Sequence, residues 1–335
     1  MGLTVGIVGC GSITRFRHAP EYVENPNVDE IVFYDRNHHR AEGMVKEFGG
    51  RVAATFEELI NDPTVDAISD CSSNEVHHIH STEALLKGKH VLCEKPLAVS
   101  VDKAKTILAA QKESGKKLMV DHNQRFTKVH QRARQIINSG EYGDVITFKT
   151  SFGHGGPEGW GVTKSNATWF FKKERSHSGV AGDLGIHKID LIHYLIDDEI
   201  TEVKSFTGSL DKVDENNQPI EVCDNVVAIF NTKKGRLGQG SFSWTYYGEE
   251  DNSTTIYLQK GIMKIYHDPE DQIIIEQPDG GKVKFELEPI QTNDNQTSTG
   301  VIDSFVDWII HDTEPPVKGE DAISSLRVIE QILED

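Results

Sequence analysis

A lysine stands at the end of a short apolar run near residue 90. The run His90-Val91-Leu92-Cys93 is typical of a buried strand, and it stops at Glu94-Lys95-Pro96. Proline fixes φ and has no N–H, so strand pairing ends there, and the bond before proline can be cis at modest cost. An amine held beside a carboxylate at this place is suited to move a proton. A surface Glu–Lys pair at a turn is the alternative interpretation.

A second set of chemically capable residues lies on a helix expected over residues 180–196. The helix is apolar nearly all round, yet Asp183, His187 and Asp190 fall at i, i+4 and i+7, on one face. Charged groups on a buried helix are costly unless they are paired or functional. We interpret them as a histidine tuned by a carboxylate for acid–base chemistry, with an internal hydrogen-bond cluster as the alternative.

A glycine turn follows the first expected strand, residues 3–8. Gly9-Cys10-Gly11-Ser12-Ile13-Thr14 matches the first two glycines of the G-x-G-x-x-[G/A] dinucleotide fingerprint, with Thr14 in place of the third. The first glycine permits a tight turn and the second lets the backbone approach a pyrophosphate, which the next helix N-terminus attracts. A strand-to-helix turn without a ligand is the alternative.

An acidic residue ends the next apolar run. Asp35 follows residues 31–34 and lies 24 positions after Gly11, near the spacing at which a carboxylate binds the adenosine ribose. Arg36 follows it, and an arginine there can instead bind a 2′-phosphate. We favour NAD(H), because a carboxylate repels a phosphate, while NADP(H) stays open.

These residues are positioned by alternating strands and helices. Further strands are expected at residues 65–68, 91–93 and 118–120, with helices over 37–48, 75–86 and 101–113, which indicates a doubly wound parallel sheet over residues 1–122. Asn74 and His77 follow one strand on the ligand side of such a sheet. They suit hydrogen bonding near the cofactor or a solvated helix start. Clustered histidines without carboxylates or thiolates at compatible spacing are weak evidence for a metal, so we expect no metal site.

The sequence changes character from residue 123 to 335. Eight strand-like runs separated by turns, with few helices, predict an α+β domain on a large, mostly antiparallel sheet. They lie at residues 145–150, 203–210, 222–230, 237–244, 254–258, 262–266, 273–276 and 283–287, and the helices at 129–139, 180–196, 300–311 and 320–333.

Composition limits the class of protein. A chain of 335 residues with 37% hydrophobic and 26% charged residues suits two soluble domains, and its net charge of −18 opposes nucleic-acid binding. It has no apolar run of about 20 residues, so we expect no membrane contact. Strand-like sequence begins at residue 3, so we expect no secretory peptide. Four scattered cysteines indicate reduced thiols in the cytoplasm.

With these motifs together, the chain resembles the Gfo/Idh/MocA family of oxidoreductases over essentially its whole length. The motifs are Gly9-Cys10-Gly11, Asn74 with His77, Glu94-Lys95-Pro96, and residues 182–187 with Asp190. The resemblance implies a Rossmann domain, then an α+β domain whose open sheet serves oligomer contact as a homodimer or homotetramer. It also implies a nicotinamide cofactor and a sugar, inositol or related polyol as substrate.

The resemblance also implies the site residues. The catalytic group maps onto Lys95, Asp183 and His187, which would also contact substrate. The stretch 123–126 lies beside cofactor and substrate in relatives. The expected cofactor-binding residues are Gly9, Gly11, Ser12, Ile13, Asp35, Arg36, Ser73, Asn74, His77, Glu94, Lys95, Gln124 and Arg125.

Hydride transfer then assigns roles to these side chains. As hydride leaves a carbinol carbon, the hydroxyl proton must also leave. We expect His187 to take that proton and Lys95 to hydrogen-bond the same oxygen, with the reverse assignment open. Trp160, in a glycine-rich loop, and Trp169 are candidate sugar contacts, with a place in the core or in an interface as the alternative for aromatic residues on a sheet.

Two other protein classes fit part of the pattern. A Rossmann methyltransferase uses a glycine turn and an acid, but it has no need of Lys95-Pro96 or of the Asp183/His187 face. A catalytically silent cofactor sensor or scaffold would keep the fold alone, and fold by itself does not establish function.

Overall fold

The computed structural model describes residues 2–161, 164–287, 299–315 and 317–334. The chain forms two compact units, one of 1–123 with 291–323 and the other of 124–290 with 324–335. The first unit therefore includes a segment from near the C-terminus, whereas the sequence predicts a single boundary after residue 122. The helix expected at 300–311 belongs to the first unit and not to the second domain. The start of this helix is hydrogen-bonded to the first unit by Asn25, whose Nδ2 donates to Asp303 Oδ1 over 2.7 Å.

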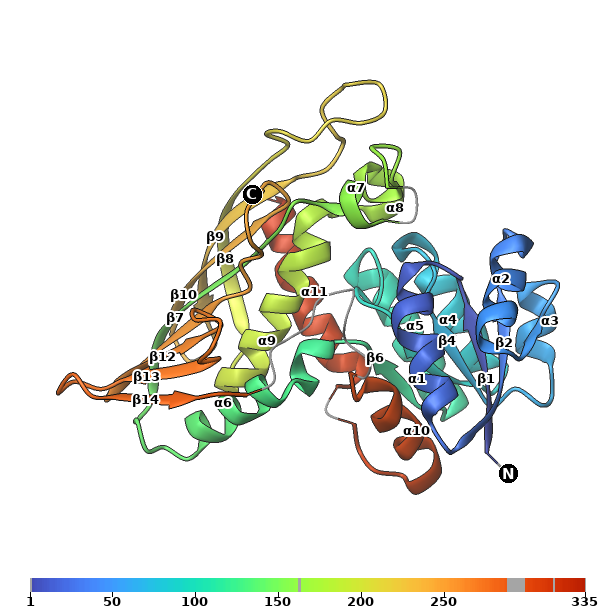
Figure 1. Ribbon diagram of the computed structural model, residues 1–335, viewed down its shortest axis with the longest axis horizontal. Coiled ribbons are helices and arrows are strands. Elements are labelled where there is room, and N and C mark those ends of the chain that lie inside the picture. Colours follow the sequence, from blue (N-terminus) through green and yellow to red (C-terminus); the bar gives the residue numbers. More distant parts are fainter. Residues whose placement is uncertain (1, 162–163, 288–298, 316, 335) are drawn as a thin grey trace. The chain divides into compact units, whose positions relative to one another are not determined.

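The first unit is built on a six-stranded parallel sheet (Figure 1). The strand order is β3-β2-β1-β4-β5-β6, so the direction of winding reverses between β1 and β4. Ligands of such sheets bind at the carboxyl edge beside this reversal. The strands are β1 (Leu3–Val8), β2 (Val28–Tyr34), β3 (Arg51–Val52), β4 (Ala67–Asp70), β5 (His90–Cys93) and β6 (Leu118–Val120).

Helices alternate with these strands, as the sequence predicts, and the strand at 51–52 and the helix at 56–61 are additional to the expected elements. Three of them begin at side chains that accept a backbone N–H of the first turn, namely Asn37, Thr55 and Ser100. The helices are α1 (Ala19–Glu24) after a π-helical turn Thr14–His18, α2 (His38–Phe48), α3 (Phe56–Asn61), α4 (His77–Leu86) after a 3₁₀ turn Asn74–Val76, α5 (Val101–Ser114) and α10 (Val301–His311).

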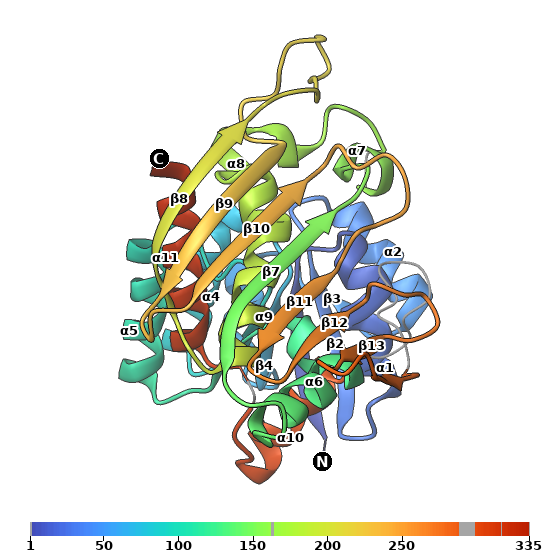
Figure 2. The same ribbon diagram turned by 90° about the vertical axis from the view of Figure 1, so that its left-hand side faces the viewer.

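The second unit contains the predicted large sheet, and all eight expected strands are present. Its order is β14-β13-β12-β11-β7-β10-β9-β8, seen face on in Figure 2. Only the central β7–β10 pair is parallel, so the sheet is mostly antiparallel. The strands are β7 (Val145–Gly153), β8 (Ile200–Gly208), β9 (Asn225–Thr232), β10 (Leu237–Ser243), β11 (Thr254–Leu258), β12 (Gly261–Ile265), β13 (Ile273–Glu276) and β14 (Lys282–Phe285).

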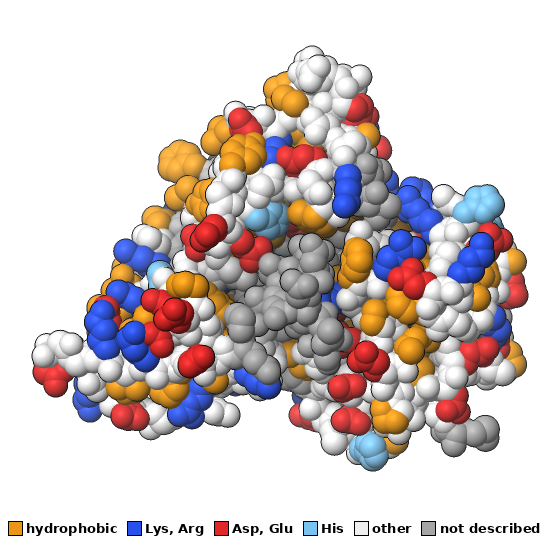
Figure 3. Space-filling view, viewed as in Figure 1, with side chains coloured by type: hydrophobic (Ala, Val, Ile, Leu, Met, Phe, Trp, Pro, Cys, Tyr) orange, Lys and Arg blue, Asp and Glu red, His pale blue; other side chains and the backbone are white. Residues whose placement is uncertain are grey.

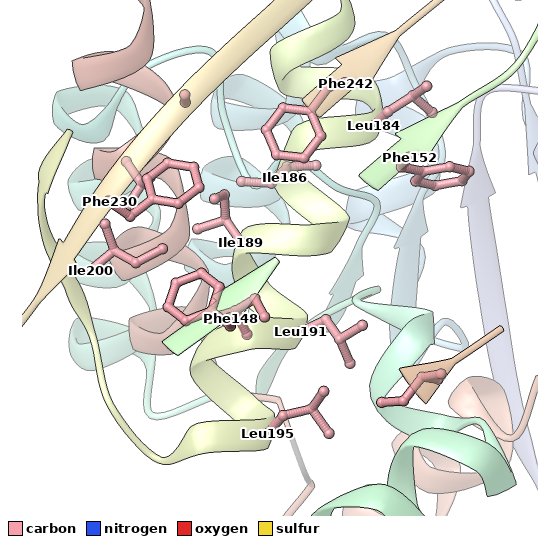
Figure 4. Packing of buried hydrophobic residues seen from close by; sticks show 14 of the residues in the cluster. Phe148, Phe152, Leu184, Ile186, Ile189, Leu191, Leu195, Ile200, Phe230 and Phe242 are labelled. Atoms are coloured by element: carbon pink, nitrogen blue, oxygen red, sulfur yellow. The ribbon is translucent and has the colours of Figure 1, made fainter. Parts of the chain in front are cut away.

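One face of this sheet packs on helices. Figure 4 shows Phe148 of β7 and Phe230 of β9 lying against Ile189 of α9, with Phe242 of β10 near Ile186. Each such buried side chain contributes roughly 1.5–3 kcal/mol to folding. The helices of the second unit are α6 (Lys128–Asn138), α7 (Pro157–Trp160), α8 (Lys173–Ser176), a π-helical turn Ala181–Gly185 that leads into α9 (Ile186–Ile196), and most of α11 (Gly319–Glu334).

Two general expectations can be compared with this structure. All four cysteines are free thiols, so no disulfide forms among them. Within the described ranges, none of the helices combines the length and the apolar character that crossing a bilayer requires.

Candidate active site

The glycine turn after β1 has the geometry of a phosphate cradle. Gly9 has φ +91°, and a Cβ there would lie 2.6 Å from the carbonyl oxygen of Cys71, so this position requires glycine. A Cβ on Gly11 would meet no described atom within 4 Å, which leaves its backbone open to a ligand. Thr14, in place of the third glycine, donates its hydroxyl to the Gly9 carbonyl over 2.5 Å. These residues fit the pyrophosphate of a dinucleotide.

Gly9→Ala tests this turn directly. A Cβ would meet backbone and force a left-handed conformation on alanine, at a cost of about 1–3 kcal/mol. We expect NADH affinity, measured by fluorescence titration, to fall at least about tenfold, with a lower Tm. Gly49→Ala is the control, since Gly49 also has positive φ but its Cβ would meet no described atom. Equal loss of NADH binding in both variants would contradict a specific role for the turn.

Asp35 stabilises the same turn. It is buried, its Oδ2 accepts the Cys10 N–H over 2.8 Å, and its Oδ1 accepts the Asn37 N–H over 2.8 Å. Each carboxylate oxygen has a further lone pair, so ribose hydroxyls can still bind there. Arg36 and Arg40 are exposed beside it.

His77 joins the ends of two strands. It is fully buried, with Nδ1 2.9 Å from the Pro96 carbonyl oxygen and Nε2 3.0 Å from that of Ser72. The alternative of a solvated helix start is therefore wrong for His77. The ring joins the turn after β4, which contains Ser73 and buried Asn74, to the segment after β5 that contains Lys95. The Lys95–Pro96 bond is cis.

Glu94 connects Lys95 to two residues that sequence reasoning missed. Its Oε1 lies 3.0 Å from Nε2 of His18, and its Oε2 accepts the Lys95 N–H over 3.1 Å. Asp121, directly after β6, places Oδ2 3.5 Å from the same Nε2. All three side chains are nearly buried. The position of Asp121 at a strand end, like that of Glu94, was the available signal; His18 on a helix gave none.

These three groups shift one another's pKa. Burial alone would lower the pKa of His18, but Cys71 and the bonds to Asp121 and Glu94 outweigh it and raise that pKa well above its ordinary value. Burial would raise the pKa of Glu94, but His18 and the charge of Lys95 lower it. For Asp121, burial and the neighbouring Glu94 charge raise the pKa. The His18 imidazole therefore carries a proton between two acids.

In the second unit, Asp183 and His187 differ in exposure. Residues 180–192 are buried except His187, which is partly exposed. Asp183 lies in the π-helical turn, where its Oδ2 accepts the indole N–H of Trp244 over 3.0 Å. The side chain of Asp183 is thus oriented by the core, and His187 is accessible to a small molecule.

Aromatic rings continue from Trp244 toward the glycine-rich loop. Phe170 lies 6.3 Å from Trp244, 5.1 Å from Trp160 and 4.0 Å from Trp169 between ring centroids. Trp160 and Trp169 are partly exposed, whereas Trp244 is fully buried. The two exposed indoles therefore belong to one cluster that reaches Asp183 through Trp244.

Gln124 and Arg125 have structural contacts within this unit. Arg125 forms a bidentate pair with buried Asp190, at 2.7 Å for both Nε–Oδ2 and Nη2–Oδ1. Gln124 Nε2 donates to Asn252 Oδ1 over 3.4 Å. Asp190 thus holds the segment 124–126 on α9, as the hydrogen-bond alternative predicts for that residue.

Lys188, beside His187, is a further residue that the sequence did not single out. It is fully buried, and Nζ donates to the Asn252 carbonyl over 2.7 Å and to Thr254 Oγ1 over 3.2 Å. Burial lowers the pKa of Lys188 to about 7. Because His187 is partly exposed, these neighbouring side chains point to different sides of the helix.

The structure therefore gathers the expected residues in two sets. In the first unit, they all follow β1, β2, β4 or β5, whose last residues pair in register at one sheet edge. That set is Gly9, Gly11, Ser12, Ile13, Asp35, Arg36, Ser73, Asn74, His77, Glu94 and Lys95. The second unit holds Gln124, Arg125, Trp160, Trp169, Asp183 and His187.

Comparison with known families agrees with both units. Residues 3–122 match the model described as "Oxidoreductase family, NAD-binding Rossmann fold", and residues 130–264 match the GFO/IDH/MocA C-terminal domain. The chain belongs to the Gfo/Idh/MocA family of oxidoreductases. The resemblance drawn from the motifs is thereby confirmed for this family.

Relatives within the Gfo/Idh/MocA family have sugar-related names. The chain is 30% identical over 236 residues to glucose-6-phosphate 3-dehydrogenase of Bacillus subtilis (strain 168), covering 70% of this chain and 65% of that protein. It is 28% identical over 198 residues to D-glucoside 3-dehydrogenase of Escherichia coli (strain K12), covering 58% and 54%. These matches thus span less than two thirds of either relative.

A solved structure extends the likeness of fold to the whole chain. Levoglucosan dehydrogenase in complex with NADH and levoglucosan superposes with a TM-score of 0.88 at 22% identity, over 100% of this chain and 97% of that one. The Rossmann sheet followed by a mostly antiparallel sheet is therefore the fold of this Gfo/Idh/MocA protein.

Proposed function

We propose that the protein is an NAD(P)-dependent dehydrogenase or reductase that acts on a hydroxyl or carbonyl group of a sugar, inositol or related polyol. The observation that carries this proposal is Lys95, held at the sheet edge that also carries the open turn at Gly11. An amine at that edge is placed for a reaction beside a bound dinucleotide. The named sugar dehydrogenases among the relatives support the substrate class.

The cofactor would be held by the glycine turn and Asp35, and it supplies the hydride acceptor or donor. His187 would remove the hydroxyl proton during oxidation and return it during reduction. Lys95 would donate a hydrogen bond to the same oxygen and so stabilise its developing negative charge. The proposal requires the two units to present Lys95 and His187 to one substrate oxygen. In the second form of the mechanism these roles are exchanged, so that Lys95 removes the proton and His187 donates the hydrogen bond.

Asp183 and the aromatic cluster are suited to orient a polyol. Asp183 Oδ2 is held by Trp244, so the carboxylate is fixed in direction and can accept a sugar hydroxyl. The partly exposed faces of Trp160 and Trp169 suit packing on the C–H face of a sugar ring. These contacts would set specificity through a loop on a rigid sheet.

NAD(H) is the favoured cofactor because of the charge of Asp35. Its carboxylate is buried at the ribose position and would repel a 2′-phosphate. Parallel fluorescence titrations with NADH and NADPH measure this preference. Tighter binding of NADPH would assign Arg36 and Arg40 to the phosphate instead.

Reduced-nicotinamide absorbance with a panel of inositols, aldoses, phosphorylated aldoses and glycosides tests the function. We expect turnover with at least one CH–OH substrate and NAD⁺, or with the matching ketone and NADH. Binding of NADH without turnover of any panel member would favour the alternative, a catalytically silent sensor or scaffold of the same fold.

The open face of the second unit's sheet supports a homodimer or homotetramer. Val227 and Ile229 of β9 are 60% and 59% exposed, while Ala228 and Phe230 point to the core, and Phe206 of β8 is 87% exposed. Hydrophobic side chains gather over β8, β9 and β10 at the outline of this unit in Figure 3. An apolar patch of this kind is typical of a protein contact.

Charges placed on this face test the contact. We expect the double variant Phe206→Lys, Ile229→Lys to sediment as a single chain, where the natural protein sediments as a dimer or tetramer, because like charges would be buried without partners. Ile310→Glu, at an exposed residue on α10 of the first unit, is the control and should leave the mass unchanged. A natural protein that sediments as one chain would exclude this role of the sheet.

A further inference from the structure

We propose that His18, Glu94 and Asp121 position Lys95 and set the charge around its ammonium group. This inference rests on the proposed function, in which Lys95 acts on the substrate oxygen. The three residues come from the turn before α1, the end of β5 and the end of β6, so the fold assembles them from distant positions.

Glu94 links the His18 imidazole to the Lys95 backbone through hydrogen bonds. Its two carboxylate oxygens have different partners, Nε2 of His18 at Oε1 and the backbone N–H of Lys95 at Oε2. His18 is itself fixed at its other nitrogen, since Nδ1 lies 2.8 Å from Ser69 Oγ, which also accepts the Tyr22 hydroxyl over 3.2 Å. A buried carboxylate held at both oxygens fixes the backbone from which the Lys95 side chain extends.

The charge of Lys95 acts on both acids of the cluster. That charge lowers the pKa of Glu94, and at Asp121 it opposes burial and the Glu94 charge, which together raise the pKa of Asp121. Buried charge is costly unless it is compensated. We therefore expect the loss of either acid to disfavour the charged form of the Lys95 amine.

Other titratable groups surround the cluster on the neighbouring elements. Glu21 of α1 faces His18 and Asp121, and burial raises the pKa of Glu21. Burial likewise raises the pKa of the Cys71 thiol after β4. His77 of α4 acts on Glu94. Among the described residues, Glu94 is hydrogen-bonded to His18 and to the Lys95 N–H and to none of these three groups.

A metal ion is the competing occupant of the same atoms. Donor atoms of His18, Glu94 and Asp121 lie within 4.8 Å of one another, which is the only such group among the described residues. A metal would require His18 to be unprotonated. The raised pKa of His18 favours a proton at Nε2 instead.

Competitive acetylation of Lys95 across pH, read by peptide mass spectrometry, tests the proposal without any substrate. Glu94→Gln and Asp121→Asn remove a negative charge, so the titration midpoint of Lys95 should fall by about one pH unit or more. His18→Gln removes a positive charge, so the midpoint should rise. A loss of packing alone would not move the Lys95 midpoint in opposite directions in the acid variants and in His18→Gln.

Controls separate charge from structure. Tyr22→Phe removes a hydrogen bond of the same network without changing charge, and it should leave the midpoint unchanged; exposed Lys112 serves as the internal standard in every sample. If His18→Gln does not fold, the proposal is still tested by comparing the Lys95 midpoint in Glu94→Gln and Asp121→Asn with the midpoint in Tyr22→Phe. Midpoints that stay within about 0.3 pH units of wild type, or that all move the same way, would overturn the proposal.

The outcome is distinguishable from failure of the proposed function. Acetylation reports the Lys95 amine whether or not turnover is found, so an inactive protein with the expected shifts keeps the positioning role. Addition of Zn²⁺ or Mg²⁺ to the natural protein should leave the Lys95 midpoint unchanged, and a metal-dependent shift that His18→Gln abolishes would assign the cluster to a cation instead.

Discussion

Lys95→Met is expected to lower kcat by about 10²–10⁴ while NADH affinity changes less than about threefold. The variant keeps the length of the side chain but removes the donor that stabilises charge on the substrate oxygen, and a single such donor accounts for roughly 3–5 kcal/mol of transition-state stabilisation. The glycine turn and Asp35, which would hold the cofactor, do not depend on the amine. Steady-state rates and fluorescence titration of NADH measure the two quantities separately.

Lys89→Met is the matched control for this variant. Lys89 precedes the same strand at its opposite end, where Nζ donates to the carbonyls of Asp62 and Val65, each over 2.7 Å. Its loss should lower Tm while kcat stays near the natural value. A Lys95→Met enzyme that turns over at the natural rate would remove the lysine from the mechanism.

The fold was largely predictable because hydrophobic periodicity decides it. Strand runs such as residues 254–258 and the capped helix after Ser100 carry their own local signals, and the structure has both. Two elements gave weak signals, β3 with two residues and α3 with six. The return of α10 to the first unit depends on contacts such as Asn25 with Asp303, which no local pattern encodes.

The candidate site was predictable where a residue type is forced by its backbone position. Gly9 is required by its φ and by Cys71, and residues that end parallel strands must share one edge. Partners chosen by tertiary packing were not predictable. His18 reaches Glu94 from a helix 76 residues away, and Asp190, on the face predicted for chemistry, is used by Arg125. The spacing of residues along a helix predicts which side chains share a face. The residues that pack against that face are set by the tertiary fold.

His187→Asn should lower kcat by about 10²–10⁴ and should also change the pH profile. A histidine that removes a proton acts in its neutral form, so the rate of oxidation in the natural enzyme rises with pH as the His187 imidazole loses its proton. His187→Asn should lose that rise, because no titrating group remains in the role. Rates of sugar oxidation between about pH 5 and 10 measure both effects.

The same profiles decide between the two forms of the mechanism. If Lys95 removes the proton, the rise belongs to an amine, and His187→Asn would keep it while Lys95→Met would abolish it. His193→Asn is the control, since His193 lies on the same helix and its Nε2 accepts the Ile200 N–H over 3.0 Å, a structural role. Because burial lowers the pKa of His193 to about 4, its loss should leave the rise in place. A His187→Asn enzyme with the natural rate and profile would leave the partly exposed imidazole without a part in catalysis.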